Sequence, residues 1–253
     1  MNDFLLLGAG AFLAGLIDAV VGGGGLIQLP LLLAVMPEAG IPVLFGTNKL
    51  SSIAGTASAA WQYARKIQIP WDVARPASVA ALLAAAAGAA TVSFIPAAAL
   101  RPMVLVLLLL VGSYVLFKPG FGQQKASILP STSRKQMAVI VGSVLGFYDG
   151  FFGPGTGSFL IFAFVRWFGM DMLQASATSK FVNLATNFAA LLYFVSHEGV
   201  LWKVGLLMAL ANIAGAQLGA RLAVRRGNGF VRILLLVVVT ALLMKLGWDY
   251  WHS

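Results

Sequence analysis

The chain has 253 residues, of which 60% are hydrophobic and only 10% charged, and its formal net charge is +9. A soluble domain carries roughly 25% charged residues, so this composition and the mean hydropathy of +0.90 predict an all-α polytopic membrane protein. The absence of cysteine excludes disulfides, thiolate metal sites and thiol catalysis. The basic residues lie in short loops between apolar stretches, as the translocon's charge rule requires, and therefore do not indicate nucleic-acid binding.

Ten apolar stretches follow one another along the chain, and we expect each to form a membrane helix or part of one. The second and the seventh have only about a dozen residues, fewer than the roughly 20 that a crossing helix needs, which favours broken or re-entrant helices. A polar segment rich in turn formers, 118–135, predicts a cytoplasmic linker between two membrane units, 1–117 and 136–253. The stretches are approximately 4–21, 25–37, 43–63, 76–95, 103–117, 137–152, 157–168, 173–195, 201–221 and 229–248.

The two units repeat one pattern at a constant offset. The motif Gly15–Gly24 recurs as Gly146–Gly155, and Thr47–Lys49 recurs as Thr178–Lys180, with the same spacing (146 − 15 = 131; 178 − 47 = 131). Each unit has five stretches, and an odd number inverts the second unit relative to the first. The sequence therefore predicts two inverted-topology repeats, an architecture of transporters whose binding site lies near the midplane, where the halves meet.

The basic residues predict the orientation. If the stretches alternate across the membrane, twelve basic residues lie on one side and three on the other. This count places the first group in the cytoplasm and both termini on the extracytoplasmic side of the inner membrane. The twelve are Arg65, Lys66, Arg75, Lys118, Lys125, Arg134, Lys135, Arg166, Arg221, Arg225, Arg226 and Arg232, and the three are Arg101, Lys203 and Lys245.

Each repeat contains a glycine-rich interruption between apolar stretches, at 22–25 and at 153–157. A continuous helix is unfavourable there, and broken backbone at membrane depth survives only where protein or a wet cavity satisfies it. A helix that restarts at Gly25 or Gly157 would aim free N–H groups into such a cavity, where an anion could bind. The alternative is that the glycines only allow close packing of helices. Their occurrence at matched positions favours a site.

The lysines begin two matching polar stripes. Lys49, Ser52 and Thr56 share one helix face, and Lys180, Asn183 and Asn187 repeat that spacing. Two such stripes could hold a small oxyanion from two sides. The alternative is that each lysine snorkels to the nearer interface, but the polar continuation of each stripe favours the site. The candidate binding residues are Gly22, Gly23, Gly24, Gly25, Thr47, Asn48, Lys49, Ser52, Thr56, Gly153, Gly155, Thr156, Gly157, Thr178, Ser179, Lys180, Asn183 and Asn187.

Asp18 and Asp149 precede the glycine interruptions by four residues. An ionised aspartate costs about 3 kcal/mol at the centre of a membrane helix, so each is expected to have a partner such as a lysine or a backbone amide. They are candidates for coupling groups that bind a proton, or else they only brace the broken helices. The amides of Gln28, Asn212 and Gln217 are more simply explained by hydrogen bonds between helices.

The paired motifs resemble the TauE/SafE family of sulfite and organosulfonate exporters over nearly the whole chain. The resemblance rests on the aspartate–glycine motifs and on Gly46–Lys49 with Ala177–Asn183. It implies secondary export of small sulfur-containing anions such as sulfite, sulfoacetate or related sulfonates, driven by a proton or sodium gradient. It does not identify this member's substrate.

Two other functions remain open at this point. A passive anion channel could use the same lysines and glycines, and flux measurements would distinguish it. An intramembrane enzyme is disfavoured because neither histidine lies in an apolar stretch and no H-E-x-x-H or G-x-S-x-G motif occurs, although paired aspartate catalysis is formally open. We expect no enzyme activity, no cofactor and no metal site. A homodimer is compatible with the sequence.

Overall fold

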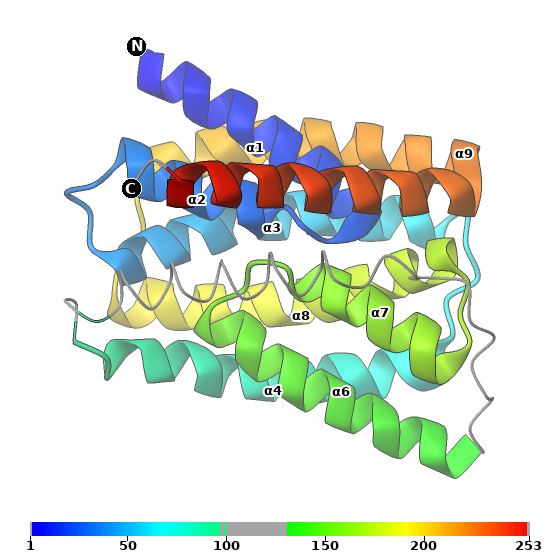
Figure 1. The fold of residues 1–253 in the computed structure, drawn as a ribbon. Helices are drawn as coiled ribbons and strands as arrows, with labels where there is room; N and C mark the ends of the chain where they lie inside the picture. Colours follow the sequence, from blue (N-terminus) through cyan, green and yellow to red (C-terminus); the bar gives the residue numbers. More distant parts are fainter. Residues whose placement is uncertain (1, 97–98, 100–130, 252–253) are drawn as a thin grey trace.

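The computed structural model describes residues 2–96, 99 and 131–251, which form eight helices and no strand (Figure 1). The first four helices are α1 (Asn2–Val21), α2 (Gly25–Val35), α3 (Ile41–Ala64) and α4 (Trp71–Ser93). The remaining four are α6 (Ser131–Phe151), α7 (Thr156–Phe168), α8 (Met172–His197) and α9 (Trp202–Trp251). The predicted all-α membrane fold is thus confirmed.

The predicted stretches agree with these helices where the structure describes them. Helix α9 covers the last two stretches and is interrupted at Gly227, whose φ of 68° and ψ of −162° are not helical. Helix α6 begins at Ser131, inside the segment predicted as a linker. The stretch 103–117 and the rest of that linker, 118–130, lie outside the described residues.

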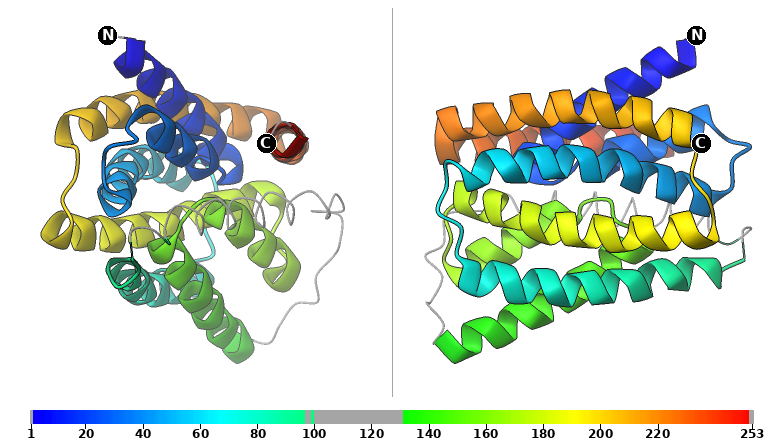
Figure 2. Two further views of the ribbon diagram at one scale, coloured as in Figure 1. Left: turned by 60° about the vertical axis from the view of Figure 1, so that its left-hand side comes forward. Right: turned by 180° about the vertical axis from the view of Figure 1, so that it is seen from behind.

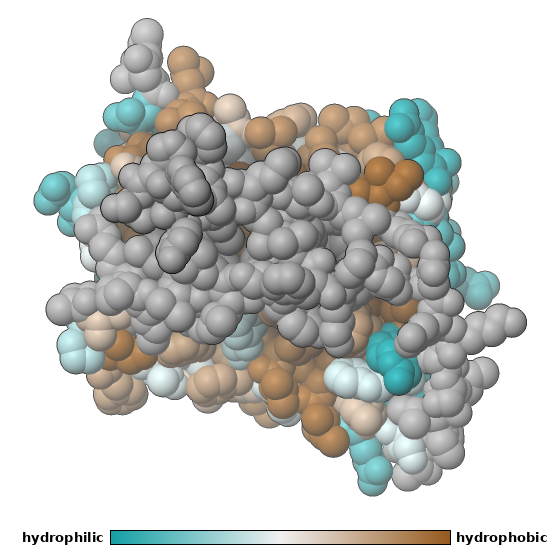
Figure 3. Space-filling view, viewed as in Figure 1, coloured by the Kyte–Doolittle hydropathy of each residue, from teal (hydrophilic) through white to brown (hydrophobic). Residues whose placement is uncertain are grey.

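The helices suit a bilayer. Among the described residues, Asp3–Val21, Trp71–Ser93 and Trp202–Val231 are long and apolar enough to cross a membrane, judged by length and composition. In the view of Figure 3, hydrophilic residues gather mainly at the two ends of the molecule, and much of the coloured surface between them is hydrophobic. Helices α3 and α8 are longer than 20 residues but carry many buried polar side chains, which identifies them as the interior helices.

The two short helices, α2 and α7, return the chain to the side from which it came. In Figures 1 and 2, α2 leads back to the end of the bundle where α1 begins, and α7 leads back to the end where α6 begins. They therefore do not cross the bundle on their own. Their predicted shortness is explained by this re-entrant course, which places the breaks between α1 and α2 and between α6 and α7 deep inside the molecule.

The helices of the two halves correspond in position. Helices α2, α3 and α4 begin 131 residues before α7, α8 and α9 (156 − 25 = 131; 172 − 41 = 131; 202 − 71 = 131). The packing is exchanged between halves, because α1 packs along α9 whereas α6, its counterpart, packs along α4.

Close helix contacts repeat this exchange. A Cβ built at Gly88 in α4 would lie 3.0 Å from the carbonyl carbon of Phe147 in α6. One at Gly219 in α9 would lie 3.1 Å from that of Leu16 in α1, which is the equivalent pair (219 − 88 = 131; 147 − 16 = 131). Such small residues let helices approach closely in a membrane. Two inverted repeats would make these paired contacts.

The charged residues of the described helices separate by end. The described members of the larger predicted group of basic residues occur where α3 and α7 end, where α4 and α6 begin and around the interruption of α9, and these points lie at one end of the bundle (Figure 2). Lys118 and Lys125 lie outside the described residues. Lys203, at the start of α9, belongs to the other end. The prediction of the cytoplasmic side depends on this separation of basic residues.

Candidate functional site

The two broken segments meet at the centre of the molecule. The chain turns at Gly22 with a φ of 75° and at Gly155 with a φ of 85°, a left-handed conformation that glycine adopts without strain. Gly22 packs directly against Gly157, so that a Cβ on either would overlap the backbone of the other. The glycines therefore break the helices and also allow the two breaks to touch.

Each lysine bonds to the aspartate of the other half. The ammonium Nζ of Lys49 in α3 lies 2.7 Å from Oδ2 of Asp149 in α6. Lys180 in α8 lies 3.2 Å from Oδ2 of Asp18 in α1. The second ion pair is the first one displaced by the repeat offset (180 − 49 = 131; 149 − 18 = 131).

Both ammonium groups are deep inside the protein. Lys49 is 3% exposed and Lys180 is 0% exposed, so neither snorkels to an interface. Each carboxylate bonds to a lysine, and among the described contacts no hydrogen bond joins Asp18 to Asp149 as an aspartyl dyad would require. Each of these buried charges thus has a partner of opposite charge, which offsets the cost of burying it.

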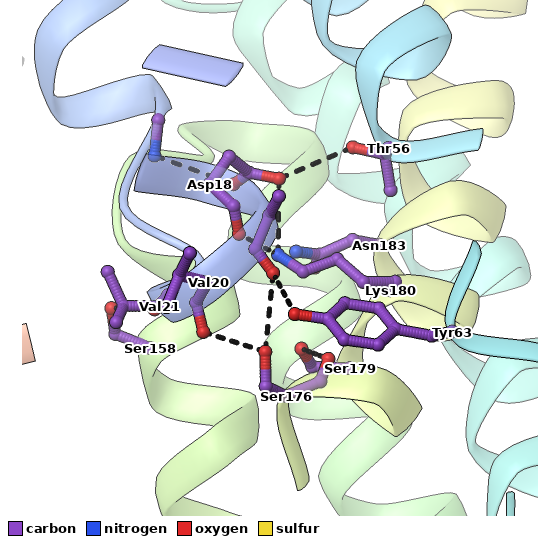
Figure 4. A network of polar contacts seen from close by, with 12 residues as sticks. Asp18, Val20, Val21, Thr56, Tyr63, Ser158, Ser176, Ser179, Lys180 and Asn183 are labelled. Carbon is purple, nitrogen blue, oxygen red and sulfur yellow. Dashed lines mark hydrogen bonds and ion pairs between the residues drawn. The ribbon is translucent and has the colours of Figure 1, made fainter. Parts of the chain in front are cut away.

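A network of side chains closes the end of α1 (Figure 4). The last carbonyl groups of a helix have no partner within it. Here the hydroxyls of Tyr63, Ser176 and Ser158 donate to the carbonyl oxygens of Ala19, Val20 and Val21, at 2.9, 2.7 and 2.7 Å. Lys180 donates to the carbonyl oxygen of Asp18. The four carbonyls at the broken end of α1 are thus all satisfied by side chains from α3, α7 and α8.

Tyr63, Ser158 and Ser176 were not identified from the sequence. They lie outside the repeated motifs, and their partners are backbone carbonyls of a distant helix. A hydroxyl in an apolar helix is a weak signal by itself, because it can bond to its own helix. The broken end of α1 was the available clue, since it implies carbonyl groups that need donors.

A second buried polar cluster surrounds Gln28. Its Nε2 donates to Oδ1 of Asn48 at 2.8 Å, and its Oε1 accepts from Asn212 at 2.9 Å and from Ser51 at 3.2 Å. The interpretation of Gln28 and Asn212 as links between helices therefore agrees with the contacts. The equivalent position in the second half is Phe159 (159 − 28 = 131), so this cluster belongs to one half only.

A small polar cavity lies between the two glycine breaks and the helices that carry the lysines. Its volume is about 30 Å³, and a water needs roughly 10–15 Å³ of such space. Asn183 is 5% exposed and faces this cavity, and its Oδ1 has no hydrogen-bond partner among the described residues. The lining residues are Asp18, Gly22, Gly25, Asn48, Lys49, Ser52, Thr56, Asp149, Gly153, Thr156, Gly157, Asn183 and Asn187.

The cavity is therefore composed entirely of residues that the sequence analysis selected. Some selected residues lie elsewhere. Lys180 is not part of the lining, and Thr47, Thr178 and Ser179 bond to backbone carbonyls within their own helices. Gly23, Gly24 and Gly155 belong to the two breaks but not to the lining.

Comparisons with known proteins identify related membrane transporters. The family model described as sulfite exporter TauE/SafE matches residues 7–246. The chain is 38% identical to probable membrane transporter protein ORF9 of a Sinorhizobium species, over 96% of this chain and 91% of the relative. It is 35% identical to a probable membrane transporter protein of Haemophilus influenzae, over 94% and 92%. It is 34% identical to probable membrane transporter protein YfcA of Escherichia coli K12, over 94% and 87%.

No solved structure matches the chain. The family model covers nearly the whole sequence, and the relatives align over almost their full lengths. Together with the membrane helices and the central polar cavity, these matches show that the chain belongs to the TauE/SafE sulfite exporter family and is a membrane transporter of that type.

Proposed function

We propose that this protein exports small sulfur-containing anions, such as sulfite, sulfoacetate or related sulfonates, across the inner membrane. The observation that carries the proposal is the central cavity, in which the buried cation Lys49 and the side-chain amide of Asn183 face the same space. The amide N–H groups of Asn183 can donate to an oxyanion, whereas its Oδ1 only accepts hydrogen bonds and needs a donor such as water. The family's name supplies the class of anion.

The anion has three sources of attraction in this cavity. Lys49 supplies a full positive charge, and the N-termini of α2 and α7 supply partial positive charges from Gly25 and Gly157. Ser52, Asn183 and Asn187 supply neutral hydrogen-bond donors. The two inverted repeats would open the cavity alternately to each side, with coupling to a proton or sodium gradient through Asp18 or Asp149.

Transport by purified protein in liposomes tests the proposal. Accumulation of sulfite and of sulfoacetate should saturate with concentration and respond to an imposed ion gradient. Lys49→Met should weaken apparent binding by about 1.5–3 kcal/mol, the range for a hydrogen bond to a charged group, which is more than tenfold in affinity. Unchanged transport of both anions by correctly inserted Lys49→Met protein would remove the site.

A passive anion channel could use the same residues. The electrical response distinguishes it, because a channel would give a current proportional to voltage without any coupled ion. The small cavity volume and the two closed ion pairs favour a transporter. We also infer that the protein is not an enzyme, since both intramembrane carboxylates are engaged by lysines rather than by each other.

A further inference from the structure

The two lysines have different surroundings although their motifs are equivalent. Lys49 lines the cavity and makes one hydrogen bond to the described part of the chain, to Asp149. Lys180 is completely buried, lies outside the cavity lining and bonds to both the side chain and the carbonyl oxygen of Asp18. An anion in the cavity therefore meets Lys49 and does not meet Lys180.

The surrounding hydroxyls show the same asymmetry. Tyr63, Ser158 and Ser176, which close the end of α1 beside Lys180, have as their counterparts Phe194, Ile27 and Phe45 (offset 131). None of those three has a polar side chain. Lys180 is thus part of a closed helix end, that of α1, whereas the positions equivalent to these hydroxyls around Lys49 carry no polar group for such a closure.

The carboxylates differ in the same sense. Asp18 accepts from Lys180 at 3.2 Å, from the Gly24 amide at 3.4 Å and from the Thr56 hydroxyl at 3.5 Å. Asp149 has a single donor among the described residues, Lys49. Hydrogen bonds to a carboxylate favour its charged form. If Lys49 turns to another anion, Asp149 loses its only donor while remaining 5% exposed.

We propose that Lys49 and Asp149 bind the anion and a proton together, whereas Lys180 and Asp18 form a structural pair. The proton adds to the Asp149 carboxylate, and the Lys49 ammonium exchanges that carboxylate for an oxygen of the anion. The proton cancels one negative charge of the anion, so a monoanion adds no net charge to the cavity and a dianion such as sulfoacetate adds one charge instead of two. This inference rests on the proposed function, namely that the cavity binds an anion.

The other groups around Asp149 support this assignment. Helix α8 presents the neutral amides of Asn183 and Asn187, and α7 presents the hydroxyl of Thr156. Helix α1 presents Asp18, which Lys180 of α8 already neutralises. Helix α4 faces α6 through alanines such as Ala81 and Ala85, which do not titrate. The neighbouring Tyr148 is also engaged elsewhere, because its hydroxyl donates to the carbonyl oxygen of Pro154 at 2.7 Å.

Among the described residues, Lys49 is therefore the one cation that bonds to Asp149.

The proposal fixes the sign of coupling. Because anion and proton favour each other's binding, each raises the affinity of the other by the same factor. They then cross the membrane in the same direction. Export proceeds when the product of anion and proton concentrations is higher in the cytoplasm than outside, which suits disposal of an anion that the cell produces in quantity.

Calorimetry on the full-length purified protein tests this, with sulfite, sulfoacetate, chloride, nitrate and acetate as probes. Titrations near pH 7 in two buffers of different ionisation enthalpy report the protons taken up per anion bound. Sulfoacetate is the reference probe, because its carboxylate and sulfonate both stay ionised above about pH 6. We expect about one proton taken up per sulfoacetate by the native protein, since binding is linked to protonation of one group. Asp149→Asn should bind without proton uptake and with an affinity independent of pH. Tyr63→Phe, which removes a hydroxyl outside the cavity lining, is the control and should retain uptake.

The lysine variants test the division of roles. Lys49→Met should lose about tenfold or more in affinity. Lys180→Met should melt at a lower temperature, and its folded fraction should bind within about threefold of the native protein, because it loses no contact with the anion. Should Lys180→Met not fold, Tyr63→Phe and Ser176→Ala remove the same closure and should lower the melting temperature with unchanged binding.

The outcomes separate this inference from the proposed function. Equal loss of affinity in folded Lys49→Met and in the Lys180 closure variants would overturn the asymmetry while sulfur anions still bind. Proton release, or uptake that persists in Asp149→Asn, would overturn the coupling. Binding of chloride, nitrate or acetate but not of the sulfur anions, with uptake lost in Asp149→Asn, would keep the inference and overturn the proposed substrate. If no probe binds, or if those that bind take up no proton, the inference is overturned.

Discussion

Gly22→Ala should destabilise the protein through two separable effects. The residue has a φ of 75°, and a side chain in the left-handed region costs about 1–2 kcal/mol. Its new Cβ would also lie 2.7 Å from the backbone nitrogen of Ser158, so the two breaks must separate by at least 0.7 Å to restore ordinary contact (3.4 − 2.7 = 0.7). Forcing extra atoms into a packed interior costs typically 1–3 kcal/mol. We expect a total loss of about 2–5 kcal/mol.

Two other glycines isolate these effects. Gly199 has a φ of 89° and nothing within 4 Å of its built Cβ, so Gly199→Ala should show only the backbone cost of about 1–2 kcal/mol. Gly8 lies in α1 with nothing within 4 Å, so Gly8→Ala should be neutral or gain about 0.5–1 kcal/mol. The assay is thermal unfolding of the purified proteins in one detergent. If the Gly22→Ala protein is no less stable than the Gly199→Ala protein, the two glycine breaks are not in contact. The cavity described between them would then not exist.

Two further predictions concern topology and the buried amides. Reporter fusions should place Ser253 outside the cytoplasm and the 118–135 segment inside, and a cytoplasmic C-terminus would contradict the orientation derived from the basic residues. Gln28→Leu should lower stability by roughly 1–3 kcal/mol in the same thermal assay, because it leaves the partners at Asn48 and Asn212 unsatisfied. Gln217→Leu, whose side chain makes no hydrogen bond to a described residue, is its control, and an equal effect in both would show that the Gln28 cluster contributes nothing.

The sequence predicted the helices well because glycines and hydropathy mark them directly. The start of α2 at Gly25 and of α7 at Thr156 agrees with the expected restart of each helix to within a residue. The residues that line the cavity also come from the repeated motifs, since duplication makes matched polar positions stand out from an apolar background. Helix ends and polar stripes are local properties, and a local pattern is sufficient to find them.

The partners and the asymmetry could not be predicted in this way. The constant offset identifies Lys49 and Lys180 as equivalent, but it does not say that each bonds to the aspartate of the other half. That depends on how α3 and α8 pack, which is a long-range property. Lys180 was expected to face the anion as Lys49 does. It bonds instead to Asp18, beside a helix end whose carbonyl groups are satisfied by the hydroxyls of Tyr63 and Ser176, outside the repeated motifs.

The exchanged ion pairs also make each half incomplete without the other. A chain that ended after α4 would carry Asp18 and Lys49 with both partners missing, and it would expose the face of α1 that packs along α9. Such a half could bury its charges only against a second copy inserted upside down in the same bilayer. The joined chain supplies that antiparallel companion in a fixed one-to-one ratio. Once joined, the halves were also free to differ, one keeping its lysine at the cavity and the other using it to close a helix end.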